Sequence, residues 1–80
     1  MRILFFAQLK DITHCGELEL ELDCVDVDTD GLWRRLIAAH PGLDRVRGSV
    51  RLAKNLDYVG PDARFGNRDE VALIPPVSGG

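Results

Sequence analysis

The sequence predicts one α+β domain, in which a mixed sheet of four or five strands carries one main helix across it. Three observations lead to this fold. The chain has an apolar segment near its start, at 3–9, another near its end, at 71–74, and one amphipathic stretch between them. Near-continuous apolar strands are typical of the centre of a sheet, where both faces are buried. The first and last strands are therefore expected to be parallel neighbours.

The first strand is predicted at 3–9 and the second in the segment ELELELD, at 17–23. The alternation in ELELELD has period two, which places its leucines on the core and its carboxylates in water, as in an edge strand. The segment KDITHCG between the strands is short enough for a hairpin loop, and Gly16 in it can take a positive φ. The alternating residues are Glu17, Glu19 and Glu21 with Leu18, Leu20 and Leu22.

The main helix follows, with Thr29 as its expected N-cap and Asp30 near the positive end of its dipole. Pro41 and Gly42 end it. Apolar residues recur at spacings of three and four, so they form one stripe that faces the core. We interpret Trp33, which lies in this stripe, as a core residue and not as a binding aromatic. The stripe is Leu32, Trp33, Leu36, Ile37 and Ala39, with Arg34, Arg35 and Ala38 turned away.

Short strands are expected in SVRLAKN, at 49–55, and in LDYV, at 56–59. The stretch GPDARFGNRDE that follows is rich in turn residues. The last strand is predicted at 71–74. Together with the opening hairpin and the helix, these elements give the topology of a β-grasp. Residues 1–74 form this domain, and residues 75–80 form an extended tail.

Composition limits what so small a domain can do. The chain has 80 residues, of which 45% are hydrophobic and 29% charged, as in a globular domain. A domain of this size buries only roughly 60% of its unfolded surface, so a deep cavity lined by several catalytic groups is not expected. The net charge of -3 argues against a nucleic-acid partner. The apolar run at the N-terminus is too short for a membrane span and lacks a signal-peptide cleavage site, so a cytoplasmic protein without a membrane partner is expected.

The two cysteines, Cys15 and Cys24, are expected to be free thiols in a reducing compartment, each buried or half-buried for structural reasons. The histidines His14 and His40 do not form a paired ligand spacing with them, so no metal site is expected. None of these four residues has the neighbouring base that an activated nucleophile needs. Any chemistry is expected in a partner.

The chain ends in IPPVSGG. Pro75 and Pro76 remove two backbone donors and fix φ, so the last strand must stop there and the tail leaves in an extended course. Gly79 and Gly80 have no side chains, which lets the terminal backbone enter a channel only a chain's width across. The α-carboxylate of Gly80 is then the functional group at the tip. A frayed terminus is the alternative, but it needs neither a rigid exit nor the apolar Val77. Ser78 completes the tail.

Strand parity also predicts a docking surface on the sheet face opposite the helix. The expected partner-binding residues are Leu4 and Phe6 of the first strand and Ala72 and Ile74 of the last. No second layer is predicted to cover them, so an apolar patch there is a candidate partner site. The alternative is a small satellite cluster beneath the loops after residue 42. The residues expected on the core side are Ile3, Phe5, Ala7, Val71 and Leu73.

The whole chain resembles the ubiquitin-like sulfur carriers, and most closely the small subunits of molybdopterin synthase. The resemblance lies in ILFFAQLKD, in the helix LWRRLIAAHPGL and above all in NRDEVALIPPVSGG. A Gly-Gly terminus alone is shared by all ubiquitin-like carriers, whereas PPVSGG after a strand is specific. Two positions depart from the family pattern. Gly31 stands where an acidic residue is common, and Ser78 stands where alanine is frequent.

The resemblance implies that Gly80 is adenylated by a ubiquitin-activating-type adenylyltransferase that uses ATP, and is then converted to a thiocarboxylate by a sulfur donor protein. The tail would next enter the large subunit of molybdopterin synthase, in a heterotetramer, and give its sulfur to a pterin precursor. The chain itself would bind no cofactor and would be the non-catalytic subunit of a sulfurtransferase. Two alternatives stay open: a sulfur carrier for thiamine or cysteine synthesis, and a ubiquitin-like modifier or plain interaction module.

Overall fold

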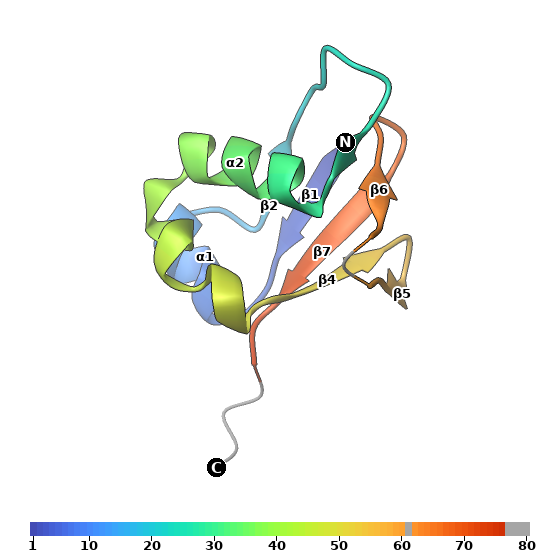
Figure 1. The fold of residues 1–80 in the computed structure, drawn as a ribbon. Coiled ribbons are helices and arrows are strands. Elements are labelled where there is room, and N and C mark those ends of the chain that lie inside the picture. The colour runs from blue at the N-terminus through green and yellow to red at the C-terminus, as the bar shows by residue number, and fades with distance from the viewer. Residues whose placement is uncertain (61, 77–80) are drawn as a thin grey trace.

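The computed structural model describes residues 1–60 and 62–76, and it contains a five-stranded mixed sheet with the main helix packed across one face (Figure 1). The first and last strands are neighbours and run parallel, with Ile3 opposite Val71 and Phe5 opposite Leu73. This confirms the predicted topology. The strand order is β2 (Glu17–Glu19), β1 (Arg2–Phe5), β7 (Glu70–Ile74), β4 (Arg51–Lys54) and β5 (Asp57–Tyr58).

The first strand is shorter than predicted. β1 ends at Phe5, and a helical segment, α1 (Gln8–Thr13), occupies the place of the expected strand end and much of the loop. Leu9 is fully buried in α1, and Thr13 one turn later is also buried. An apolar run alone does not distinguish a short strand from a short helix, so the prediction of a strand through residue 9 was wrong. β1 and β2 nevertheless form the expected antiparallel pair.

Two backbone positions in this connection also differ from expectation. Gly16 does not take a positive φ. Instead, Ala7 before α1 has a φ of 51°, and His14 after it has a φ of 60°. His14 therefore provides the left-handed residue that commonly ends a helix. Ala7, which was expected to face the core, is exposed.

The central strands are buried on one face only. Ile3 and Phe5 of β1 are buried, as are Val71 and Leu73 of β7, whereas the intervening residues are half-buried or exposed. The expectation of burial on both faces was wrong, because helix α2 covers one face and no element covers the other in the described part of the chain (Figure 1). The burial pattern predicted for 17–23 holds, with exposed glutamates and leucines packed in or against the core, but the strand ends at Glu19 and is four residues shorter than predicted.

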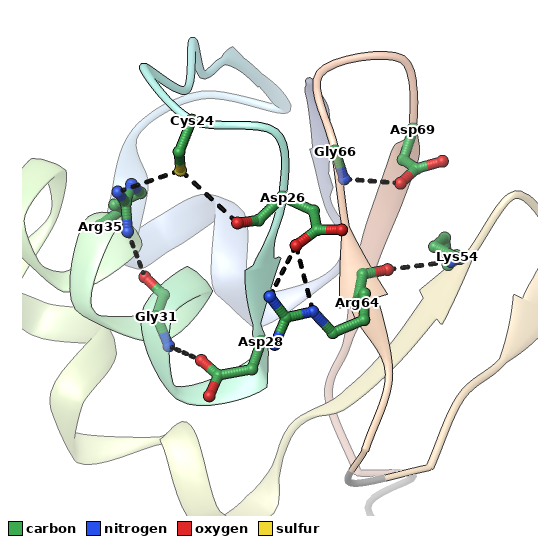
Figure 2. Close-up of polar contacts among 9 residues, drawn as sticks. All are labelled: Cys24, Asp26, Asp28, Gly31, Arg35, Lys54, Arg64, Gly66 and Asp69. Atoms are coloured by element: carbon green, nitrogen blue, oxygen red, sulfur yellow. Dashed lines mark hydrogen bonds and ion pairs between the residues drawn. The ribbon is translucent and has the colours of Figure 1, made fainter.

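The main helix, α2 (Thr29–Ala39), begins one residue earlier than expected, and Asp28 caps it. The Oδ1 atom of Asp28 accepts a 2.7 Å hydrogen bond from the backbone N–H of Gly31 (Figure 2). Thr29 is thus the first helical residue and not the N-cap. Adjacent Asp and Thr residues are both good caps, so the sequence did not distinguish them. The helix ends before Pro41, as predicted.

The apolar stripe of α2 forms a large part of the core. Leu32, Trp33 and Leu36 are buried, which confirms Trp33 as a core residue. Ile37 packs against this core at its edge, whereas Ala39 is exposed and lies outside the stripe. Two short 3-10 helices, η1 (Pro41–Arg45) and η2 (Arg47–Ser49), then lead to β4. None of the helices in the described residues is long and apolar enough to cross a membrane.

A second, two-stranded sheet was not predicted. β3 (Val27–Asp28) pairs antiparallel with β6 (Arg64–Phe65) and places Phe65 in the core. Asp26 holds this pair from the side, since its Oδ1 accepts hydrogen bonds from Arg64 at 2.6 Å (Nη2) and 3.2 Å (Nε) (Figure 2). Strands of two residues are too short to show a period of two, so the sequence contains no signal for them.

Candidate functional site

The root of the C-terminal tail lies at the centre of the main sheet. β7 is paired with β1 on one side, as far as Leu73, and with β4 on the other, as far as Ile74, which lies opposite Arg51. Pro75 follows half-buried and Pro76 exposed, and neither belongs to a strand. Since proline has no N–H to continue the ladder, the chain leaves the sheet here, at the end remote from the N-terminus (Figure 1). The remaining tail residues predicted for the site, Val77, Ser78, Gly79 and Gly80, lie outside the described residues.

The predicted docking residues lie on the uncovered face of the sheet, beside this exit. Leu4 is directly opposite Ala72 in the parallel pair, and both are half-buried, as is Ile74. Phe6 is 45% exposed. Phe6 follows the last residue of β1 and does not belong to the strand. Because Phe5 pairs with Leu73, Phe6 is at the level of Ile74. Four apolar residues thus gather where the tail begins.

The register of the sheet extends this apolar face to residues that the sequence analysis missed. Ala53 of β4 lies between Ala72 and Tyr58 of β5, opposite both, so the three side chains share one face. Tyr58 is 63% exposed, and the guanidinium carbon of Arg51 lies 5.6 Å from the centre of its ring. β5 has only two residues, so the sequence alone does not indicate which way Tyr58 faces. We name the set of Leu4, Phe6, Ala53, Tyr58, Ala72 and Ile74 the outer face.

The end of this surface away from the tail is charged. Arg2 contacts Glu17 at 2.9 Å and Glu70 at 3.3 Å. The hydrogen bond that Arg2 donates to Glu17, together with the charges of the nearby glutamates, raises the pKa of Arg2. Exposed ion pairs of this kind contribute little to stability. A charged residue also lies at the tail end of the outer face, because Arg51 is exposed opposite Ile74 and is two residues from Ala53 in β4.

The cysteines and histidines take separate structural positions. Cys15 is half-buried against the core, as expected, but Cys24 is exposed, so the expectation of a buried or half-buried thiol was wrong for Cys24. The Cys24 thiol donates to the Asp26 carbonyl at 3.5 Å and lies 3.9 Å from an Arg35 nitrogen (Figure 2). His40 packs edge-on against Phe5, at 5.9 Å between ring centres. Among residues 1–60 and 62–76, no three potential metal ligands cluster together.

Comparison with known proteins places this arrangement in a family. Residues 3–80 match the model of the ThiS family. The molybdopterin synthase sulfur carrier subunit of Chlamydomonas reinhardtii is 38% identical over the whole of this chain and 98% of its own length. That of Arabidopsis thaliana is 35% identical, over the whole of this chain and 82% of its own length.

A solved structure agrees with the sequence relatives. SAMP1 of Haloferax volcanii, a small archaeal modifier protein, has a TM-score of 0.82 at 28% identity, with 99% of this chain and 97% of its own covered. The fold, the strand that precedes the Gly-Gly tail and the full-length matches all indicate the same family. The chain therefore belongs to the ThiS family, and its curated relatives within that family are sulfur carrier subunits of molybdopterin synthase.

Proposed function

We propose that this protein is the sulfur carrier subunit of a molybdopterin synthase and that Gly80 carries the sulfur as a thiocarboxylate. The observation that carries the proposal is the full-length match to sulfur carrier subunits, with a central strand that leads directly into IPPVSGG. Family membership indicates the chemistry at Gly80, and the described residues support the way in which the tail brings Gly80 to a partner. The reaction takes place in partner proteins, in the cytoplasm.

The structure supports delivery through a fixed root and a slender tip. Pairing with β1 as far as Leu73 and with β4 as far as Ile74 holds the end of β7 in place, and Pro75 and Pro76 restrict the direction in which the chain continues. A tip of two glycines requires little width. When residues 1–74 are docked on a partner, the length of the tail therefore determines how far into that partner the carboxylate of Gly80 reaches.

The proposed chemistry begins with activation, because a carboxylate is a poor electrophile. In an adenylyltransferase partner, a Gly80 carboxylate oxygen attacks the α-phosphorus of ATP, and pyrophosphate leaves. The outer sulfur of a persulfide on a donor protein then attacks the acyl carbon and displaces AMP, which gives an acyl disulfide. A second thiol of the donor cleaves the S–S bond, is itself oxidised to a disulfide with the first donor sulfur, and releases the thiocarboxylate. The large subunit transfers this sulfur to a pterin precursor. The chain needs no cofactor of its own, since ATP is bound by the activating partner.

We further propose that the outer face docks the large subunit. Its apolar residues surround the point from which the tail starts, so a partner that covers them receives the tail at a defined distance. Phe6 is the central contact, because an aromatic side chain at 45% exposure beside the tail root offers a large apolar area to a partner.

A second candidate function is a ubiquitin-like protein modifier. The likeness to SAMP1 favours it, because that relative is a modifier protein and its structure covers nearly the whole of this chain. Both functions begin with the same adenylated glycine and differ in the acceptor. A modifier transfers its acyl carbon to a lysine amine, whereas a carrier transfers only sulfur and regains its carboxylate.

The experiment combines the chain with the activating enzyme, ATP and a sulfur source, and measures the mass of the C-terminus. Replacement of one oxygen by sulfur identifies the thiocarboxylate. The large subunit and the pterin precursor are then added, and conversion is followed. Deletion of Gly80 should abolish conversion. An added residue after Gly80 should do the same, because it shifts the reactive carbonyl by about 3.5 Å, more than catalytic geometry tolerates.

Gly79→Val is the third variant, and it should fail because a β-branched residue is wider and restricted in its backbone. All three changes lie beyond β7, so unfolding curves should match the wild type. Normal conversion by the extended chain, confirmed unprocessed, would contradict the mechanism. Accumulation of lysine-linked conjugates in place of converted pterin would support the modifier.

A further inference from the structure

The hairpin between β4 and β5 has an unfavourable residue at its tip. Lys54 pairs with Asp57, so Asn55 and Leu56 form the whole connection. Both have positive φ, 51° for Asn55 and 77° for Leu56, as in the two-residue type I′ turns that join hairpin strands. Asn is well suited to such a backbone. Leucine is not, because glycine is the residue that adopts the second position without strain.

The side chain of Leu56 makes no contact with the core that would offset this strain. Its side chain is 91% exposed, and it is absent from the residues that pack against the core. Exposure of a large apolar side chain at a strained position is not explained by folding. Strained residues of this kind often serve a function, and here the only property that Leu56 offers is an apolar side chain held out into solvent.

The turn beneath Leu56 is firmly held by Asn55. The backbone N–H of Asn55 donates to the Glu70 carbonyl at 2.8 Å, and its Oδ1 accepts from the Glu70 N–H at 3.0 Å. Its Nδ2 donates to Asp69 at 3.1 Å. The tip is therefore attached to the start of β7, so Leu56 is presented on a rigid support, and a partner loses little entropy in binding it.

Leu56 lies next to the outer face. Tyr58, two residues further on, is opposite Ala53, and Ala53 is opposite Ala72. Tyr58 and Leu56 thus expose apolar side chains at the β5 edge of the sheet, and buried Ala53 and half-buried Ala72 lie between them and the tail root. Among the described residues, the large exposed apolar side chains are Phe6, Val25, Leu56 and Tyr58, and only Val25 belongs neither to this hairpin nor to the outer face.

We propose that Leu56 is an anchor that enters an apolar pocket of the large synthase subunit and defines the far end of the docking surface. The inference rests on the proposed function, because it assumes that the outer face docks that subunit. The large subunit is the chosen partner because the proposed function makes the outer face its docking surface, and the hairpin tip adjoins Tyr58 of that face. Asp57 is exposed and has no ion-pair partner within the described residues, so the rim of the pocket should carry Lys or Arg.

The test is Leu56→Gly in the full chain, with the dissociation constant for the large subunit and the thermal midpoint measured in parallel. Glycine relieves the strain and removes the anchor, so the midpoint should stay the same or rise while the dissociation constant increases at least about tenfold. Leu56→Asn, which tolerates the same backbone, should weaken binding similarly. The matched control is Val25→Ser, since Val25 is also 91% exposed but has no positive φ, and it should leave both quantities unchanged.

Each outcome supports or overturns the proposal. A dissociation constant within about twofold of wild type for Leu56→Gly overturns the anchor alone, provided that the wild type binds and is thiocarboxylated. Weaker binding that accompanies a lower midpoint also overturns it, because the residue would then be structural. A defect confined to activation by the adenylyltransferase overturns the choice of partner. Failure of the wild type to bind the large subunit overturns the proposed function itself, and the anchor with it.

Discussion

The side-chain amide of Asn67 binds both backbone polar groups of Leu22. Its Oδ1 accepts from the Leu22 N–H at 2.8 Å, and its Nδ2 donates to the Leu22 carbonyl at 3.1 Å. The two residues are 45 positions apart in the chain. The contact attaches the long connection between β2 and β3 to the turn before β7 and keeps Leu22, which is 5% exposed, in the core.

Asn67→Ala should therefore lower the free energy of unfolding by about 1–3 kcal/mol, because it leaves a partly buried donor and acceptor without partners. Urea unfolding followed by circular dichroism measures the change. The matched control is Arg68→Ala, the next residue, which is exposed and makes no hydrogen bond or ion pair within residues 1–60 and 62–76. Equal effects of the two substitutions would contradict the role of Asn67.

Phe5 and Phe6 are adjacent, identical side chains in opposite environments, with exposures of 1% and 45%. Phe6→Asp should weaken binding to the large subunit or the activating enzyme and leave the unfolding free energy within about 0.5 kcal/mol of wild type. Phe5→Ala should instead destabilise the fold by about 3–5 kcal/mol. Titration of the partner, with unfolding curves in parallel, separates the two effects. Normal binding by folded Phe6→Asp would exclude the outer face as the docking surface.

Asp69 makes stability depend on pH at the acidic end. Burial alone would raise the pKa of Asp69, but hydrogen bonds from the Gly66 N–H, at 2.7 Å, and from Asn55 hold it below its ordinary value. The unfolded state then binds more protons than the folded state between the two pKa values, so stability rises with pH across that interval. The contribution is present above the unfolded pKa of about 3.9 and is lost as pH falls through the folded value.

Asp69→Asn provides the measurement, because it removes the titrating group. The wild type should be more stable than the variant at pH 6, and the difference should shrink as the pH is lowered below about 4. Urea midpoints across this range test it. A difference that stays constant with pH would show that the ionisation of Asp69 does not contribute.

Neither thiol is expected to take part in sulfur transfer. Cys15 packs at the edge of the core, and Cys24 contacts Asp26 and Arg35, with no base beside it among the described residues. The double variant Cys15→Ala, Cys24→Ser should therefore be thiocarboxylated and should support conversion at the wild-type rate when all partners are supplied. A folded double variant that fails to transfer sulfur would show that an internal thiol participates.

Part of the candidate site followed from periodicity alone. Alternation within β1 and β7 predicted that Leu4, Ala72 and Ile74 share the face opposite the helix, and the register agrees. Phe6 lies beyond the end of β1, so strand parity does not place it, although it is exposed as a docking residue requires. Tyr58 and Ala53 were not predicted. Ala53 takes its face from pairing with Ala72, which is 19 residues away in the chain, and Tyr58 takes its face from pairing with Ala53. No local pattern encodes the first of these pairings.

The sequence by itself determined the β-grasp topology, because strong apolar strands, a Glu-Leu alternation and one amphipathic helix each carry their own period over enough residues to be recognised. Tertiary structure decided where short elements begin and end. β1 stops at Phe5 because Leu9 is buried as part of a helix, and β3 exists because Phe65 enters the core beside Val27. These outcomes depend on contacts between distant segments, and the free energy of such contacts outweighs the weak local preferences of a few residues.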